Sequence, residues 1–121
     1  MRTGAPWLAQ SEPTADDLHW QVAIGACATR NGVAEEILYR GYPIERVQEL
    51  TGYKWLAFLI SVLAFTLAHL SSWEAAQLIV VGFGAVILAL LYLWRRDLIC
   101  NMVAHFLVDL VGFVAAGAQH A

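Results

Sequence analysis

The fold is decided by residues 74–117, EAAQLIVVGFGAVILALLYLWRRDLICNMVAHFLVDLVGFVAAG, in which two apolar runs flank a charged turn at residues 95–97. Each run is about 20 residues long, the length that an α-helix needs to cross the hydrocarbon core of a bilayer. We therefore predict two membrane-spanning helices, 74–94 and 98–117.

The composition of the whole chain agrees with a membrane protein. Of 121 residues, 60% are hydrophobic and 14% are charged, and the mean hydropathy is +0.59. Soluble domains are about half apolar and a quarter charged. Seven basic residues against ten acidic ones give a net charge of −3, so the sequence offers no basic surface for nucleic acid. Two cysteines do not make a disulfide framework, and both lie in apolar stretches.

Two further segments precede these helices. Residues 54–70 are almost entirely apolar, and residues 18–50 are apolar in their first half and charged in their second, where Pro43 should kink or interrupt the helix. The chain is too short to cover so many apolar faces as a soluble core. We therefore predict an all-α fold, an integral membrane bundle of four helices, with residues 1–17 as a polar lead-in and 18–121 as the transmembrane domain.

The basic residues predict the orientation of the bundle. The connection between the first two helices holds Arg46 and Lys54, and the last turn holds Arg95 and Arg96, whereas the turn at 71–72 has no lysine or arginine. By the positive-inside rule we expect the two basic connections to face the cytoplasm, in the inner membrane if the protein is bacterial.

Ionisable residues stand inside these apolar segments at helical spacing. Glu36 and Arg40 are four residues apart and can pair on one face, which leaves Glu35 about 100° away. On the next helices stand His69 and the i, i+4, i+8 stripe Asn101, His105 and Asp109. A charge at the bilayer centre costs roughly 2.5–3.5 kcal/mol, so such residues mark functional sites.

A buried carboxylate beside two imidazoles can activate water. The carboxylate takes a proton from water, and the imidazoles hold the water or stabilise an oxyanion. The same three groups, Glu35, His69 and His105, are also candidate ligands for a divalent metal such as zinc, although the sequence contains no HExxH motif. The sequence is thus compatible with no cofactor or with a divalent metal such as zinc. In a purely structural interpretation, the polar side chains only form hydrogen bonds that hold the helices together. This interpretation would suffice for a single histidine, but it does not explain why two histidines and two adjacent carboxylates occur together.

Three motifs in order resemble a known family. Residues 35–41 (EEILYRG), 65–69 (FTLAH) and 105–109 (HFLVD) resemble the EExxxR, FxxxH and HxxxN/D pattern of the CPBP family, the CAAX-protease and bacteriocin-processing (Abi) intramembrane endopeptidases. The resemblance covers about residues 18–117. It implies proteolysis within the membrane.

The resemblance also implies residue roles. Glu35 would be the catalytic base, supported by the pair Glu36 and Arg40. His69 and His105 would bind water and stabilise the oxyanion, and Asp109, where asparagine is common, would orient His105 or complete the polar site. The family is often labelled metalloprotease; we favour a glutamate-dependent, metal-free mechanism.

The expected partners are a lipid bilayer and a membrane-anchored peptide or protein substrate. Family members usually carry further helices before EExxxR, which residues 1–17 do not provide, so a second copy or a partner protein could supply them. A membrane scaffold or immunity protein without protease activity, or a small ion or proton pathway, are the alternative functions.

Counting along the helices tests whether one site can form. Glu35 lies 17 residues before Gly52 and His69 lies 17 after it, which places both about 25 Å from that turn. His105 is nine residues past Arg96, about 13 Å. The three heights agree only if the turn at Gly52 extends about two helical turns beyond the turn at 95–97.

Overall fold

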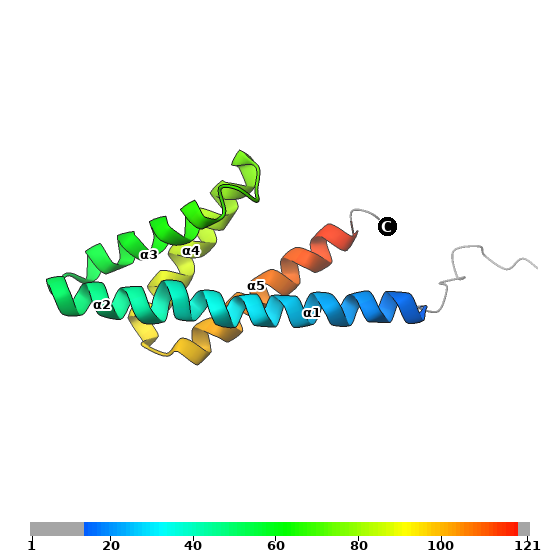
Figure 1. The fold of residues 1–121 in the computed structure, drawn as a ribbon, viewed down its shortest axis with the longest axis horizontal. Helices are drawn as coiled ribbons and strands as arrows, with labels where there is room; N and C mark the ends of the chain where they lie inside the picture. Colours follow the sequence, from blue (N-terminus) through cyan, green and yellow to red (C-terminus); the bar gives the residue numbers. More distant parts are fainter. Residues whose placement is uncertain (1–13, 119–121) are drawn as a thin grey trace, which may run out of the picture.

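The computed structural model describes residues 14–118, and this part of the chain consists of helices joined by short turns, without a strand (Figure 1). The elements are α1 (Ala15–Glu36), the π-helical turn η2 (Ile37–Gly41), α2 (Tyr42–Thr51), α3 (Lys54–Ala68), α4 (Ala75–Arg95) and α5 (Leu98–Ala118). Because α1, η2 and α2 follow one another without a break, the chain forms four rods. The prediction of an all-α bundle of four helices is confirmed.

The first rod begins inside the stretch that was predicted as a polar lead-in. Thr14 caps α1, since its side chain accepts a hydrogen bond from the backbone N–H of Asp17, whose carboxylate accepts one from the backbone N–H of Thr14. This reciprocal capping box satisfies two N–H groups that the first helical turn leaves without partners. The helix therefore starts at Ala15; residues 1–13 of the lead-in lie outside the described residues.

Pro43 interrupts the first rod as predicted, and the interruption takes the form of a π turn. Proline has no N–H, so Pro43 cannot donate to the carbonyl of Tyr39, which lies four residues before it. The turn Ile37–Gly41 precedes it, and the N–H of Tyr42 reaches back to the carbonyl of Ile37. Ser61 of α3 donates its hydroxyl to the carbonyl of Tyr39 at 2.6 Å. A side chain of the neighbouring helix thus replaces the missing backbone donor.

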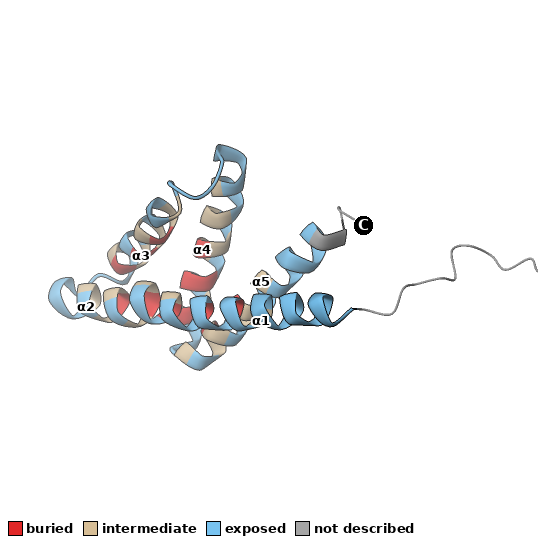
Figure 2. Cartoon of the chain, turned by 45° about the vertical axis from the view of Figure 1, so that its right-hand side comes forward, coloured by how far each residue is buried: buried red, intermediate tan, exposed pale blue. Residues whose placement is uncertain are grey.

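The outward faces of α3, α4 and α5 are mainly apolar, as a bilayer requires. Among the described residues α4 and α5 are long and apolar enough to cross a membrane, and α3 is a shorter apolar helix. Large apolar side chains such as Ile79, Val111 and Trp94 are mostly exposed, and the buried residues occupy only sides that face other helices (Figure 2). Lipid tails cover such surfaces without the cost of hydrating them. The chain is thus an integral membrane bundle.

The two basic connections lie at the same end of the bundle. Arg96 in the α4–α5 turn pairs with Glu45 of α2 at 2.7 Å and also donates to Gln48. Tyr92 donates to the same Glu45 at 2.9 Å. Glu45 lies seven residues before Gly52, about two helical turns. The turn at Gly52 therefore extends beyond the α4–α5 turn, as the heights of the three site residues required.

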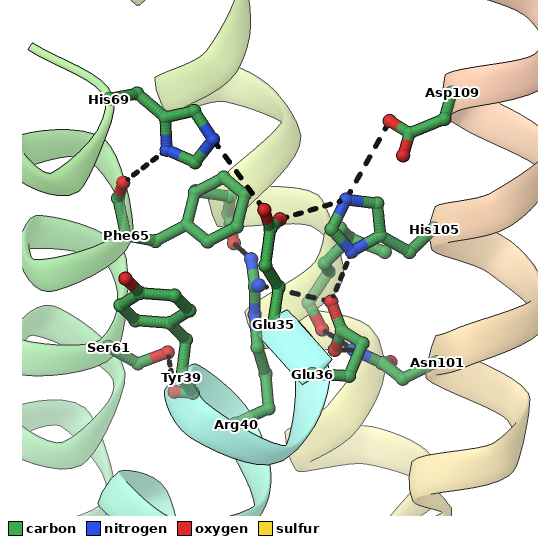
Figure 3. Close-up of polar contacts among 12 residues, drawn as sticks. Glu35, Glu36, Tyr39, Arg40, Ser61, Phe65, His69, Asn101, His105 and Asp109 are labelled. Atoms are coloured by element: carbon green, nitrogen blue, oxygen red, sulfur yellow. Dashed lines mark hydrogen bonds and ion pairs between the residues drawn. The ribbon is translucent and has the colours of Figure 1, made fainter. Parts of the chain in front are cut away.

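Helices α4 and α5 diverge from their shared turn. In Figures 1 and 2 the two helices run apart, α4 toward α3 and α5 along α1. Four polar residues of the three motifs, Glu35, His69, His105 and Asp109, line a cavity between the helices (Figure 3).

Candidate active site

Glu36 is the centre of the buried polar cluster. It is fully buried in the last turn of α1. Its Oε1 accepts from Arg40 Nη1 at 3.0 Å and from His105 Nδ1 at 2.8 Å, and its Oε2 accepts from Asn101 Nδ2 at 2.5 Å (Figure 3). The predicted pair between Glu36 and Arg40 is confirmed. A buried carboxylate is tolerated only with such a set of partners, so Glu36 is committed to holding the helices together.

Arg40 is equally enclosed. Its guanidinium is fully buried, donates weakly to the carbonyl of Ala85 at 3.5 Å and lies 4.3 Å from the centre of the Phe65 ring. The cation therefore receives its stabilisation from one carboxylate, one backbone dipole and one aromatic face. The ring of Phe65, the first residue of the FTLAH motif, thus packs against the Arg40 guanidinium of the EEILYRG motif.

The ring of His105 is oriented by Glu36. Because a carboxylate oxygen can only accept, the hydrogen bond at 2.8 Å requires a proton on Nδ1. The other nitrogen, Nε2, then faces Glu35 Oε2 at 3.5 Å and Asp109 Oδ1 at 3.7 Å. The stripe on α5 thus brings His105 and Asp109 together, but the close orienting contact comes from α1.

His69 is oriented in the same way by its own helix. Its Nδ1 lies 2.8 Å from the carbonyl of Phe65, which again requires the proton on Nδ1. Its Nε2 faces Glu35 Oε1 at 4.0 Å. The two imidazoles therefore direct equivalent nitrogens to the two oxygens of one carboxylate.

Glu35 is the one carboxylate of the pair that opens to a cavity. Its side chain is 25% exposed, whereas that of Glu36 is 0% exposed. The cavity has a volume of about 500 Å³ and is also lined by His69, His105 and Asp109. Its remaining wall is mainly apolar and comes from α4 and α5, including Val80, Leu88, Val108 and Phe113. The Glu35 carboxylate is thus placed at the polar end of a mainly apolar cavity.

All six predicted site residues, Glu35, Glu36, Arg40, His69, His105 and Asp109, belong to this cluster. Asn31, four residues before Glu35, lines the same cavity as expected from the helical spacing. Tyr39, four residues after Glu35, does not line it and packs edge-on against Phe65 with ring centres 5.3 Å apart. Regular α-helical spacing would place Tyr39 on the face of Glu35, but the π turn from Ile37 changes that spacing.

Ser61 has a supporting role that the sequence analysis did not identify. It is fully buried and holds the carbonyl of Tyr39. A serine in an apolar helix is a weak signal by itself, and its partner is a backbone atom that no motif records.

A metal site is not preformed by these side chains. Within residues 14–118 no group of three His, Cys, Asp or Glu side chains is arranged to hold a metal ion. In both histidines Nδ1 is occupied by a hydrogen bond, and both Nε2 atoms are directed at the Glu35 carboxylate. The two Nε2 lone pairs and the Glu35 carboxylate are therefore all acceptors, and because metal-ligating histidines usually donate their other N–H in this way, the three groups remain candidate ligands.

Comparison with known proteins identifies the family. A search among curated proteins found no match, and neither did a search among solved structures. The family model described as type II CAAX prenyl endopeptidase Rce1-like matches residues 18–111. This stretch contains the three motifs and every residue of the polar cluster described above. The chain therefore belongs to the Rce1-like family of type II CAAX prenyl endopeptidases.

Proposed function

We propose that the protein is an intramembrane endopeptidase that hydrolyses a peptide bond of a membrane-associated protein or peptide, with Glu35 as the general base. One observation carries this proposal: Glu35 stands at the end of the cavity with both its oxygens facing imidazole Nε2 atoms. Glu36, its neighbour, has its oxygens occupied by other partners. The two carboxylates therefore have separate tasks.

The proposed reaction uses one water molecule. Glu35 removes a proton from water, and the water oxygen bonds to the carbonyl carbon, whose oxygen becomes an oxyanion. When the tetrahedral intermediate breaks the carbon–nitrogen bond, the protonated Glu35 returns its proton to the leaving nitrogen. Proton transfer of this kind contributes typically about 10²–10⁴-fold to the rate.

The histidines have a defined role in this scheme. Since Nδ1 of each ring carries a proton, a neutral ring presents a lone pair on Nε2 that can accept a hydrogen from water. To donate to the oxyanion, a ring must also carry a proton on Nε2. Nε2 of His105 faces the carboxylates of Glu35 and Asp109, whereas Nε2 of His69 faces Glu35 alone, so we assign the contact with the oxyanion to His105.

The proposed substrate follows from the family and from the cavity. The family name points to prenylated proteins that end in a CAAX sequence. The apolar wall formed by α4 and α5 suits a substrate that carries a large apolar group from the bilayer. We propose that the end with the two basic connections faces the cytoplasm.

The test replaces Glu35 by glutamine, which keeps the shape of the side chain and removes the base. We expect cleavage of a prenylated CAAX peptide by the full chain in liposomes to fall by about 10²–10⁴-fold. The matched control is Glu49→Gln, because Glu49 is an exposed glutamate at the far end of α2 whose partner is Arg46. Undiminished cleavage by Glu35→Gln would reject the assigned base, and full biological activity without any cleavage would favour the scaffold function.

Adding a chelator to the wild-type protein in the same assay tests whether cleavage requires a bound metal ion. We expect the rate to stay the same, because the proposed reaction needs only Glu35, the two histidines and a water molecule. A loss of cleavage that zinc restores would show that Glu35, His69 and His105 act as ligands.

A further inference from the structure

Asn101 is a buried polar residue on α5 that lies outside the three motifs and does not line the cavity. We infer that Asn101 is a positioning residue, which fixes the Glu36 carboxylate and through it the ring of His105. This inference rests on the proposed function, because it assigns a task to the support of a proposed catalytic histidine.

The orientation of the Asn101 amide is determined by its partners. Its Nδ2 lies 2.5 Å from Glu36 Oε2 and 2.9 Å from the carbonyl oxygen of Leu88 on α4. Both partners can only accept, so the NH₂ group must face them and uses both of its hydrogens. The Oδ1 atom has no hydrogen-bond partner among the described residues. Asn101 is therefore present as a double donor, which connects α1 to α4.

Glu36 needs this donor in order to hold His105. Arg40 and His105 both bind Oε1 of Glu36, and in the described structure Asn101 alone binds Oε2. The terminal torsion of a glutamate is soft, so a carboxylate held at one oxygen can turn. A turn would move Oε1 away from His105 Nδ1 and release the ring. Arg40 of η2 and Asn101 and His105 of α5 thus bind the Glu36 carboxylate at three points.

The location of Asn101 determines what its loss should change. Because it does not line the cavity, it affects the substrate only through Glu36 and His105. Replacement of Asn101 should therefore lower kcat and leave KM nearly unchanged.

The first test is Asn101→Leu, which removes the donor at similar size. In the full chain in lipid nanodiscs we expect kcat to fall by about ten-fold, the cost of losing one hydrogen bond to a buried charge. In NMR spectra with ¹⁵N-labelled histidine, the Nδ1–H proton signal of His105 should move upfield while that of His69 stays in place. Tyr92→Phe is the control, because it removes a part-buried interhelical hydrogen bond one helical turn from Leu88, and its partner Glu45 lies outside the polar cluster. We expect it to leave kcat and both signals unchanged.

The second test, Asn101→Asp, keeps the shape and does not depend on how well the leucine variant folds. As a neutral acid, aspartate can donate one hydrogen bond to Glu36 Oε2, whereas an ionised aspartate cannot donate and repels Glu36. The ratio of wild-type to variant kcat should therefore grow as the pH rises. A residue that only fills space would give a constant ratio.

The inference is overturned if Asn101→Leu keeps both the His105 signal and kcat, or if the ratio for Asn101→Asp is the same at every pH. These outcomes differ from failure of the proposed function, in which Glu35→Gln itself would retain cleavage. The His105 signal also reports on the Asn101 contact without any assay of activity.

Discussion

Glu35 and Glu36 are adjacent in the sequence, yet the fold gives them different surroundings. Residues that follow one another on a helix point about 100° apart, so one carboxylate is directed between α1 and α5 and the other into the cavity. Glu36 is fully buried and binds Arg40, His105 and Asn101. Among the described residues, the nearest polar contact of the Glu35 carboxylate is His105 Nε2, at 3.5 Å. Glu36 thus neutralises Arg40, which leaves Glu35 available for the proton transfer that we propose.

Replacement of Arg40 by leucine should destabilise the protein strongly. It leaves the Glu36 carboxylate buried without its cation, and breaking a buried pair in this way costs about 3–5 kcal/mol. The free energy of unfolding can be measured by titration with a denaturing detergent. The control is Arg46→Leu, since the side chains of Arg46 and Glu49 are 60% and 61% exposed while those of Arg40 and Glu36 are 0% exposed. The control should change stability by less than about 1 kcal/mol, and equal effects of the two changes would contradict this account.

Among the elements, the π turn η2 links the polar residues to the membrane-spanning rods. It lies between Glu36, which holds α5, and Pro43, which cannot continue the regular hydrogen-bond pattern. Ser61 of α3 binds the carbonyl of Tyr39 that the interruption leaves available. The same turn places the guanidinium of Arg40 against the ring of Phe65 on α3. One irregular turn therefore fixes α3, and with it His69, relative to α1.

Ser61→Ala should weaken this connection. The variant leaves a buried carbonyl without its donor, which costs about 1–3 kcal/mol. In a Pro43→Ala background the backbone N–H of residue 43 becomes available to that carbonyl, so the loss of Ser61 should cost less. Unfolding measurements on the four variants of this double-mutant cycle give the coupling between the two positions. Strict additivity would show that Ser61 does not compensate for the proline.

At the scale of the whole molecule, the divergence of α4 and α5 produces the chamber in which the site lies. The two helices meet at the turn that Arg96 fixes to α2 and separate toward the other end (Figure 1). Gly84 on α4 and Gly112 on α5 both line the cavity, and a Cβ atom on either would meet no atom within 4 Å. The glycines therefore leave the walls of the chamber wide without being needed for helix packing.

Gly112→Leu should narrow the chamber and spare the fold. We expect cleavage of a substrate with a long prenyl chain to fall by at least about ten-fold, because apolar pockets discriminate on that order between groups of different size. Gly25→Leu is the matched control: a Cβ there also meets no atom within 4 Å, and Gly25 does not line the cavity. Thermal unfolding should remain close to that of the wild type in both variants. Equal cleavage by the two variants would show that the substrate does not use this space.

Much of the architecture could be predicted from the sequence because its causes are local. Runs of about 20 apolar residues span a bilayer whatever their neighbours are, and the predicted helix 74–94 is found at Ala75–Arg95. The spacing of Glu36 and Arg40 likewise places both on one helical face. Counting residues from the turns also predicted that Glu35 and His69 lie at one height, and that His105 joins them only if the turn at Gly52 extends about two helical turns beyond the α4–α5 turn.

The contacts that make the site were decided only by the tertiary structure. The bonds from Glu36 to Asn101 and to His105 join residues 65 and 69 positions apart, and they depend on how α1 and α5 are rotated against each other. The exclusion of Tyr39 from the cavity depends on a π turn that the α-helical spacing does not predict. A sequence fixes the period and the depth of each helix, because these come from backbone geometry and from lipid. Rotation and divergence of the helices follow instead from side chains packing in three dimensions.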